Sequence, residues 1–253
     1  GATRPPGTTA GPTLAAHCKV TGRMNERTGV GGKPFHIGFE LRLPKDWNGR
    51  FFFQGGGGLD GVLGPAFGLF DPQQGAATNA LSRGFAVVST DGGHRGSSAF
   101  DGNFGADPQA RIDYAYNAID KVTLAAKEAL QQYYGKGPEK SYFVGCSNGG
   151  REALVTAQRH DDFDGVVAGA PGLATYDQWL HNLFALRVVA RVAGVPAGQV
   201  PSDTSTAYTD IQLAAVSKHF MARCDALDGL ADGLIQRPEA CRAGEADWRA
   251  LRC

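Results

Sequence analysis

A short apolar segment that leads into a glycine-rich turn and then a helix constrains this chain most strongly. Residues 140–145 (KSYFVG) are typical of a buried strand and residues 148–159 (NGGREALVTAQR) of a helix. The junction, Gly145-Cys146-Ser147-Asn148-Gly149, matches G-x-S-x-G. Small neighbours let a serine occupy a strained strand-to-helix turn, where it can act as a nucleophile. We therefore predict that Ser147 is the nucleophile; the alternative is a serine that merely caps the helix.

The residues before position 173 alternate between strand and helix patterns. We expect helices at 73–82 and 110–134, and strands at 35–43, 50–54, 84–90 and 164–168. Such alternation indicates a mostly parallel sheet with right-handed crossovers. With the serine turn, it predicts the α/β class and an α/β-hydrolase fold, in which helices flank a mostly parallel sheet. Residues 1–172 are then the N-terminal part of a catalytic domain.

The pattern changes after Pro171-Gly172. Residues 176–192 and 209–223 have helical spacing, and no further buried strand is visible up to Cys253. We interpret 173–253 as the start of an insertion over the sheet edge.

Four consecutive glycines, Gly55 to Gly58, follow the expected strand at 50–54. In α/β hydrolases the loop after an early strand supplies an N–H to the oxyanion hole, and glycine permits close approach to a substrate carbonyl. We choose the backbone N–H groups of Gly58 and Asn148 as the oxyanion donors. A plain flexible loop is the alternative; a phosphate cradle is disfavoured because no Lys-Ser/Thr follows at Walker spacing.

A catalytic triad of this fold places its acid and its base after the serine. The histidines that follow Ser147 are His160, His181 and His219, and we interpret each as a solvated or capping residue. The acid and base are therefore expected outside these 253 residues. Asp91 and His94 precede the serine, and we expect Asp91 to hydrogen-bond the turn leading into the glycine-rich loop.

Charge and cysteine content bound the partners and the compartment. The chain has 25 basic and 25 acidic residues, which removes the electrostatic argument for binding nucleic acid or an anionic membrane. No stretch approaches the roughly 18 apolar residues of a membrane helix, and residues 1–12 are not an intact signal peptide. The 5 cysteines form no C-x-x-C pair. Free thiols in a cytosolic enzyme remain an alternative to disulfides, and the terminal Cys253 suggests that the polypeptide continues.

The motif 145–151 (GCSNGGR), with a cysteine directly before the nucleophile, resembles the tannase/feruloyl esterase family, which includes bacterial mono(2-hydroxyethyl) terephthalate hydrolases. The resemblance runs from about Leu14 to Cys253. Further segments that carry it are 44–51, 90–94, 107–111, 142–147 and 164–172.

The resemblance implies a secreted or periplasmic enzyme that cleaves esters of gallate, ferulate or related aromatic acids, with a lid over the acyl group. In the family, the cysteine before the nucleophile pairs with one after the catalytic histidine. Cys146 has no such partner downstream, so the acid, the base and most of the lid are expected in a C-terminal remainder of the same polypeptide. Cys18 and Cys253 each resemble one cysteine of another disulfide that is found in the family.

Cys224 and Cys241 can close one disulfide within the chain, around an acidic loop. From the residues alone, the loop is an ordinary acidic surface loop or a site for a hard cation such as Ca²⁺; it is not an EF-hand. The resemblance implies a structural calcium site in the lid. Its ligands would be the side chains of Asp225, Asp228 and Asp232 and the carbonyls of Leu230 and Leu234.

The leading hypothesis is acyl transfer to water, in which Ser147 forms an acyl-enzyme with an aromatic ester. One alternative is a non-catalytic protein that binds phenolic esters on a hydrolase scaffold, and another is a serine peptidase of the same fold. We also expect residues 1–253 alone to be inactive and poorly soluble, because the sheet edge is open and apolar.

Overall fold

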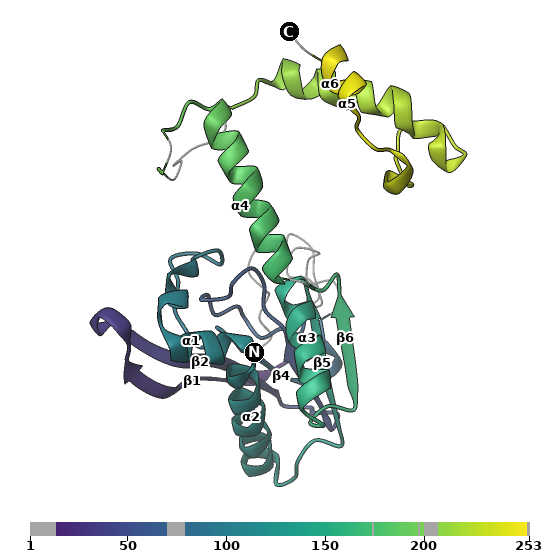
Figure 1. Cartoon of the computed structure of the whole chain (residues 1–253). Coiled ribbons are helices and arrows are strands. Elements are labelled where there is room, and N and C mark those ends of the chain that lie inside the picture. Colours follow the sequence, from purple (N-terminus) through teal and green to yellow (C-terminus); the bar gives the residue numbers. More distant parts are fainter. Residues whose placement is uncertain (1–13, 70–78, 174, 197, 200–206, 252–253) are drawn as a thin grey trace. The chain divides into compact units, whose positions relative to one another are not determined.

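The structure is a computed structural model that describes residues 14–69, 79–173, 175–196, 198–199 and 207–251. The chain divides into two compact units, Gly1–Leu173 and Ala174–Cys253 (Figure 1). Among the described helices, none has the length and apolar character needed to cross a membrane.

The first unit contains a 6-stranded sheet with the order β1-β2-β4-β3-β5-β6. Antiparallel pairing joins β1 to β2 and β2 to β4, whereas β3, β4, β5 and β6 pair in parallel. The predicted α/β class with a mostly parallel sheet is confirmed. The strands are β1 (His17–Thr28), β2 (Pro34–Pro44), β3 (Arg50–Gln54), β4 (Ala86–Thr90), β5 (Lys140–Cys146) and β6 (Gly165–Gly169).

Strand β1 was not predicted from the sequence. It lies at the sheet edge, and most of its side chains are half-buried or exposed, so its sequence (HCKVTGRMNERT) lacks apolar alternation. Its pairing with β2 also shifts register between Met24 and Arg27, as a bulge does at sheet edges.

The helix expected at 110–134 is present but interrupted. It consists of α1 (Pro108–Ile112), a π-helical turn η5 (Asp113–Asn117) and α2 (Ala118–Tyr134). Asp107 caps α1 by accepting the Ala110 N–H at 2.8 Å. It also forms an ion pair with Arg27 at 2.6 Å, so one carboxylate joins the start of this helix to the edge strand.

Helices α2 and α3 (Asn148–Arg159) pack on one face of the sheet (Figure 1). Alternate residues of β3, Phe51 and Phe53, are fully buried on that face with residues of both helices, because side chains alternate along a strand. The other face has a smaller core that includes Val87, Leu81 and Phe67.

Shorter elements lie between these. They are the 3₁₀ turns η1 (Val30–Gly32), η3 (Leu81–Arg83) and η4 (Gly102–Ala106). Most of the helix expected at 73–82 lies outside the described residues, and η3 occupies the described end of that range.

The second unit contains helices and loops, with no strand among its described residues. Helix α4 (Thr175–Val192) and helix α5 (Asp210–Cys224) match the two predicted helices closely. A capping box in which Thr209 and Gln212 bond to each other's backbone fixes the start of α5. The remaining elements are η6 (Asp225–Asp228), η7 (Pro238–Ala240) and α6 (Glu245–Ala250).

Candidate active site

Ser147 lies between β5 and α3 with a backbone conformation that few non-glycine residues adopt. Its φ is 58° and its ψ is −117°, which costs on the order of 1–3 kcal/mol. The Ser147 N–H donates to the Gly169 carbonyl at 3.1 Å, and its own carbonyl accepts from Arg151 at 3.1 Å and Gly172 at 3.2 Å. These bonds hold the strained turn, and the residue is exposed, as a nucleophile requires.

The glycines around Ser147 are required by close backbone packing. A Cβ on Gly145 would lie 2.4 Å from the Gly149 carbonyl oxygen, and one on Gly150 would lie 2.4 Å from the Gly169 oxygen. A Cβ on Gly149 would lie 2.7 Å from the oxygen of Gly56. Larger residues would therefore force the strand, the helix and the glycine-rich loop apart.

The glycine-rich loop lies directly against this turn. The Gly55 N–H donates to the Val144 carbonyl at 2.9 Å, and the Gly149 N–H donates to the Gly56 carbonyl at 3.0 Å. Gly58 has a φ of +62°, and a Cβ there would lie 2.1 Å from the Ala99 oxygen. The structure thus brings together the loop and the start of α3, the two segments chosen from the sequence as oxyanion donors.

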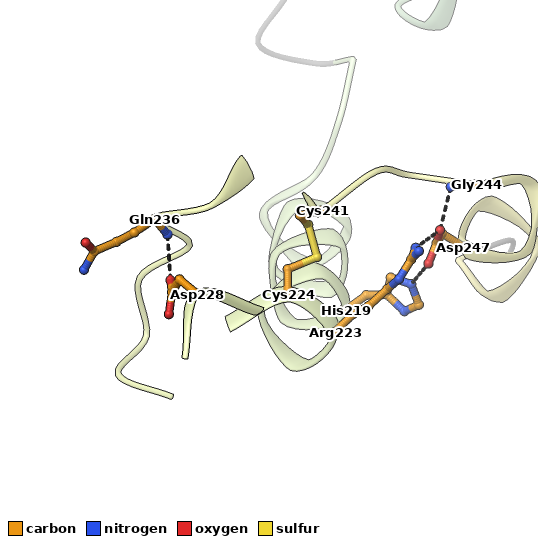
Figure 2. The surroundings of a disulfide bond; sticks show 8 residues. All are labelled: His219, Arg223, Cys224, Asp228, Gln236, Cys241, Gly244 and Asp247. Carbon is orange, nitrogen blue, oxygen red and sulfur yellow. Dashed lines mark hydrogen bonds and ion pairs between the residues drawn. A yellow bond between two sulfur atoms is a disulfide. The ribbon is translucent and has the colours of Figure 1, made fainter. Parts of the chain in front are cut away.

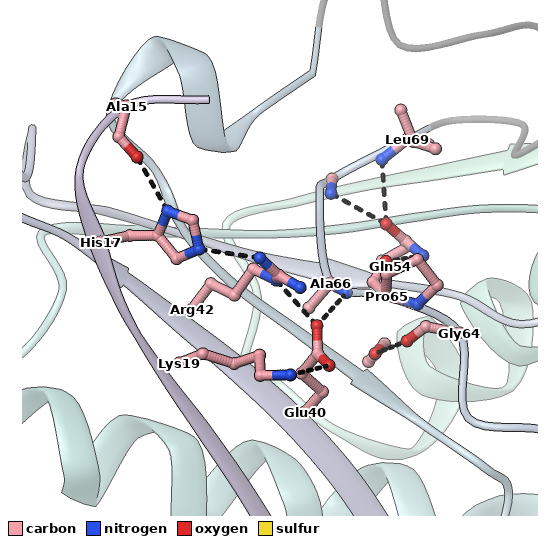
Figure 3. Close-up of polar contacts among 12 residues, drawn as sticks. Ala15, His17, Lys19, Glu40, Arg42, Gln54, Gly64, Pro65, Ala66 and Leu69 are labelled. Atoms are coloured by element: carbon pink, nitrogen blue, oxygen red, sulfur yellow. Dashed lines mark hydrogen bonds and ion pairs between the residues drawn. The ribbon is translucent and has the colours of Figure 1, made fainter. Parts of the chain in front are cut away.

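The far end of the same loop is fixed by side chains of the sheet (Figure 3). Gln54 accepts the N–H groups of Gly68 and Leu69 at 2.8 and 3.0 Å. Glu40 accepts the Ala66 N–H at 2.9 Å and also binds Arg42 at 2.7 Å. Buried side chains thus tether the loop at its far end as well.

A buried polar network behind the turn was missed by the sequence analysis. The Asn148 side chain donates to Asp60 at 2.6 Å and to Glu152 at 3.0 Å. Its amide oxygen accepts the Tyr114 hydroxyl at 2.8 Å and the Arg151 Nε at 2.8 Å. Burial is the main cause that raises the pKa of Tyr114 to about 12, so its hydroxyl stays a donor at neutral pH. Asn148 therefore joins the loop, α3 and the π-helical turn.

Arg151 connects α3 to the π-helical turn. Its guanidinium donates to the carbonyls of Ala115 at 3.2 Å and Tyr114 at 3.1 Å. It also lies 4.4 Å from the centre of the Tyr114 ring. Single π turns leave carbonyls free of the regular helical ladder, and here these carbonyls bind the helix that carries the turn of Ser147.

Asp91 and His94 are buried beside the loop. The Asp91 carboxylate accepts the N–H groups of Gly38 at 2.9 Å and Gly93 at 3.0 Å. Only its backbone carbonyl meets the loop, through the Gly61 N–H at 2.8 Å, so the predicted link exists but does not use the side chain. His94 stacks on Phe104 with centroids 3.7 Å apart, and burial lowers its pKa.

The three histidines that follow Ser147 in the sequence lie in different environments. His160 ends α3, and its N–H donates to the Thr156 carbonyl at 2.9 Å. His181 is exposed on α4. His219 bonds to Asp247 at 2.9 Å rather than being solvated. Within the described part of the first unit, the His160 side chain does not hydrogen-bond to Ser147, and it faces Asp120 at 3.9 Å instead.

The predicted disulfide between Cys224 and Cys241 is present, and Asp247 reinforces it (Figure 2). Asp247, on α6, binds His219 and Arg223 of α5 and accepts the Gly244 N–H at 2.7 Å. The covalent bond and these contacts hold α5 and α6 together. Cys18 and Cys146 are free thiols, and Cys253 lies outside the described residues.

The acidic loop offers hard oxygen ligands, but its carboxylates bind the loop's own backbone. Asp225 accepts from Asp232 and Gly233, Asp228 from Leu230 and Gln236, and Asp232 from Leu234. The predicted ligands Asp225, Asp228, Leu230, Asp232 and Leu234 therefore share one exposed loop, and calcium binding there stays a prediction.

A group of possible metal ligands was not predicted. Among the described residues, only Asp120, His160 and Asp162 bring one ligand atom each within 4.8 Å of one another. Lys127 lies 3.7 Å from the Asp162 carboxylate and competes for it. The group can hold a metal ion, but its donors do not define which one.

The cavities on the described part of the first unit include two formed by loop and strand residues. The larger, about 660 Å³, is lined by Gly61, Val62 and Leu63 of the continuing loop and by Arg23 and Arg95. The smaller, about 320 Å³, includes Phe52 and Tyr142. Ser147 lines neither of them.

Comparison with known proteins identifies the family. The family model "Tannase and feruloyl esterase" matches residues 18–253. The chain is 41% identical to mono(2-hydroxyethyl) terephthalate hydrolase of Piscinibacter sakaiensis over 98% of the chain and 43% of that protein. It is 33% identical to a probable feruloyl esterase B-1 of Aspergillus fumigatus over 80% of the chain and 35% of that protein.

Solved structures agree. The crystal structure of feruloyl esterase B from Aspergillus oryzae matches 100% of this chain and 45% of its own length, with a TM-score of 0.68 and 29% identity. An esterase from the same organism matches 90% of this chain and 40% of its own, with a TM-score of 0.62 and 28% identity. The chain thus spans less than half the length of the relatives named here. By motif, fold and similarity, this chain belongs to the tannase and feruloyl esterase family.

Proposed function

We propose that the protein is a serine carboxylic ester hydrolase that cleaves esters of aromatic acids, such as ferulate, gallate or terephthalate monoesters. One observation carries the proposal: Ser147 is exposed in a strained turn whose backbone bonds to the glycine-rich loop. The similarity to enzymes named for terephthalate and feruloyl esters supports the substrate class.

In the proposed reaction, the Ser147 hydroxyl attacks the ester carbonyl carbon and its proton passes to a general base. The base then gives this proton to the leaving oxygen as the carbon–oxygen bond breaks, and the alcohol leaves. Water then attacks the acyl-enzyme, releases the aromatic acid and restores the hydroxyl. The N–H groups of Gly58 and Asn148 hold the oxyanion. As the first residue of α3, Asn148 has an N–H without an intrahelical acceptor, and the helix dipole favours negative charge there. We do not assign the base to His160, His181 or His219.

The test uses a serine-directed fluorophosphonate and a panel of methyl ferulate, methyl gallate and a terephthalate monoester, applied to the full-length protein. Ser147→Ala should abolish labelling and lower kcat by at least about a thousandfold. Ser217→Ala, at an exposed serine of α5, is the matched control and should change neither. Labelling that survives in Ser147→Ala would rule out this nucleophile, and faster cleavage of an aliphatic ester than of the panel would rule out the substrate class.

The proposal extends to a structural Ca²⁺ in the acidic loop. The donor set of Asp225, Asp228 and Asp232 is chemically suitable for a hard cation. The ion pairs seen among described residues of the second unit include those of Asp247 and Glu239. Millimolar Ca²⁺ should raise the melting temperature and a chelator should lower it, and Asp228→Asn should reduce both effects. Equal melting temperatures with Ca²⁺ and with chelator would exclude the site.

We also propose that the protein is secreted or periplasmic. A disulfide closes within the second unit, and disulfides persist in oxidising surroundings, which supports secretion or a periplasmic location. The expected partner is a small aromatic ester, and neither a nucleic acid nor a membrane is part of the proposal.

A further inference from the structure

Two buried carboxyl groups meet behind the turn of Ser147. Asp60, in the loop after the glycines, is 3% exposed, and Glu152, on α3, is 1% exposed. Asn148 donates to one oxygen of each, at 2.6 and 3.0 Å, so the two carboxyl groups contact the same amide nitrogen. The backbone closes around the Asp60 carboxyl, because a Cβ on Gly56 or Gly92 would lie 2.6 or 2.8 Å from its oxygens.

Of the four carboxyl oxygens of Asp60 and Glu152, one accepts no hydrogen bond from the described residues. Both Glu152 oxygens accept a bond, one from Asn148 at 3.0 Å and the other from the Gly56 N–H at 3.0 Å. Oδ1 of Asp60 accepts from Asn148, but Oδ2 is buried and has no hydrogen-bond partner among the described residues. A buried polar atom without a hydrogen bond is costly. A proton on that oxygen, donated to Glu152, would satisfy it.

The surrounding groups do not neutralise two negative charges. Arg151, on α3, uses its guanidinium for the Asn148 amide oxygen and the carbonyls of Tyr114 and Ala115. The Tyr114 hydroxyl also donates to Asn148. His94, beyond Gly61, is buried, and its pKa is lowered. The positive charge of Arg151 lowers the pKa of Asp60, but among the described residues it forms no ion pair with either carboxyl. One cation does not balance two buried negative charges, so one of the two carboxyls keeps a proton.

We propose that Asp60 and Glu152 share one proton as a carboxylic acid–carboxylate pair, and that this pair positions the glycine-rich loop beside Ser147. Burial first, and then the charge of Glu152, raise the pKa of Asp60 well above its ordinary value, which supports a protonated Asp60. Both are positioning residues, because they act through the backbone of the loop and not on the substrate.

Two hydrogen bonds connect the carboxyl pair to the turn that carries Ser147. The Glu152 carboxylate accepts a hydrogen bond from the Gly56 N–H. The Gly56 carbonyl in turn accepts one from the Gly149 N–H in the first turn of α3. The next residues, Gly57 and Gly58, carry N–H groups that donate no hydrogen bond within the described part of the chain. This step rests on the proposed function, in which the Gly58 N–H faces the oxyanion. A shift of Gly56 would displace that donor.

The test compares Asp60→Asn with Glu152→Gln in the full-length protein. An asparagine at position 60 keeps an oxygen for Asn148 and gains an N–H for Glu152, so every hydrogen bond survives without the proton. We expect its kcat to stay within about threefold of the parent protein, because no oxyanion donor moves. A glutamine at position 152 has only one acceptor oxygen for the Gly56 N–H and the Asn148 amide. Its kcat should fall by about 10- to 100-fold, with a smaller change in KM. Glu128→Gln, on the exposed face of α2, should change neither.

A second readout does not depend on activity. Because the fold favours protonated Asp60, its contribution to stability is complete below the ordinary carboxyl pKa and is lost as the pH rises through the raised pKa. The melting temperature of the parent should therefore fall at alkaline pH more steeply than that of Asp60→Asn. An infrared difference spectrum at pH 7 should show a protonated carboxyl band in the parent that is missing in Asp60→Asn.

The outcomes separate the two proposals. Equal alkaline slopes together with no protonated carboxyl band would overturn the shared proton. A kcat of Glu152→Gln that stays within about threefold of the parent would overturn the positioning role. Fluorophosphonate labelling that ignores Ser147 would overturn the proposed function, while the spectroscopic and stability results would still decide whether the pair exists.

Discussion

Backbone packing at single residues sets how closely the glycine-rich loop can approach the turn of Ser147. Gly55 is the contact point, because a Cβ there would lie 2.9 Å from the Gly149 Cα and 3.0 Å from the Gly145 Cα. Both neighbours are backbone atoms and cannot rotate away. At Gly57, by contrast, a Cβ meets no atom within 4 Å. The two positions therefore differ in packing although they are close in sequence.

Gly55→Ala should destabilise the first unit by about 1–3 kcal/mol, since overpacking forces a backbone shift. The matched control Gly57→Ala should change the free energy of unfolding by less than about 0.5 kcal/mol. Urea denaturation followed by circular dichroism measures both. Equal stability of the two variants would show that the loop does not touch the turn as described.

Asp91 provides a pH-dependent prediction. Burial raises its pKa to about 6, against hydrogen bonds from Gly93 and Gly38 that lower it. Since the folded state favours the protonated carboxyl, its contribution to stability is full below the ordinary pKa and is lost as the pH rises through about 6. The stability of the parent relative to Asp91→Asn should fall by about 3 kcal/mol from pH 3 to pH 8. A flat difference for Asp91→Asn across this pH range would contradict the assignment.

Site residues that belong to a contiguous sequence motif could be predicted. Site residues whose partners are far away in the sequence could not. Ser147 is recognisable because its strand, turn and helix are contiguous. Asp60 meets Asn148 across a separation of 88 residues, and Gly56 meets Glu152 across 96. Neither Asp60 nor Glu152 belongs to a motif, so only the fold could reveal that they pair.

At the scale of elements, apolar periodicity predicted the buried strands and the long helices but not the edge or the irregular turn. Strand β1 carries polar, exposed residues and is defined by its pairing with β2. The π-helical turn at Asp113–Asn117 lies inside the range 110–134 that was predicted as one helix. Its irregularity becomes visible in the structure, where Arg151 binds the carbonyls of Tyr114 and Ala115.

The disulfide joins two elements of the second unit and gives a prediction at this scale. Replacing Cys224 and Cys241 by serine should lower the stability of that unit by about 3 kcal/mol, the value expected for a closed loop of this length. Trp248, whose ring packs 5.7 Å from that of Phe220, reports the unfolding of this unit by fluorescence. Cys18→Ser removes an exposed free thiol and is the control. A double variant as stable as the parent under oxidising conditions would contradict the prediction.

At the scale of the whole molecule, the two units differ in how much apolar surface they cover. The first has a continuous core on one face of its sheet and a smaller one on the other. The second leaves large apolar side chains exposed, including Phe184 at 68% and Ile211 at 82%. Apolar exposure of this extent promotes association.

Residues 1–253 prepared alone should therefore bind a dye such as ANS and associate as their concentration rises. Phe184→Ser with Ile211→Ser should reduce both effects, and Ser217→Ala should not. Light scattering and dye fluorescence provide the measurements. A monomeric, dye-negative preparation would contradict the prediction.

The tethering of the glycine-rich loop at both ends has a consequence for how new specificities arise. Glu152 fixes Gly56 at one end, while Gln54 and Glu40 fix the other. Between these anchors, a Cβ added at Gly57 or Gly64 would meet no described atom within 4 Å. Substitution at these two positions can therefore change the loop surface while the anchored backbone stays in place. Under the proposed function, the substrate preference could change in this way without a loss of folding.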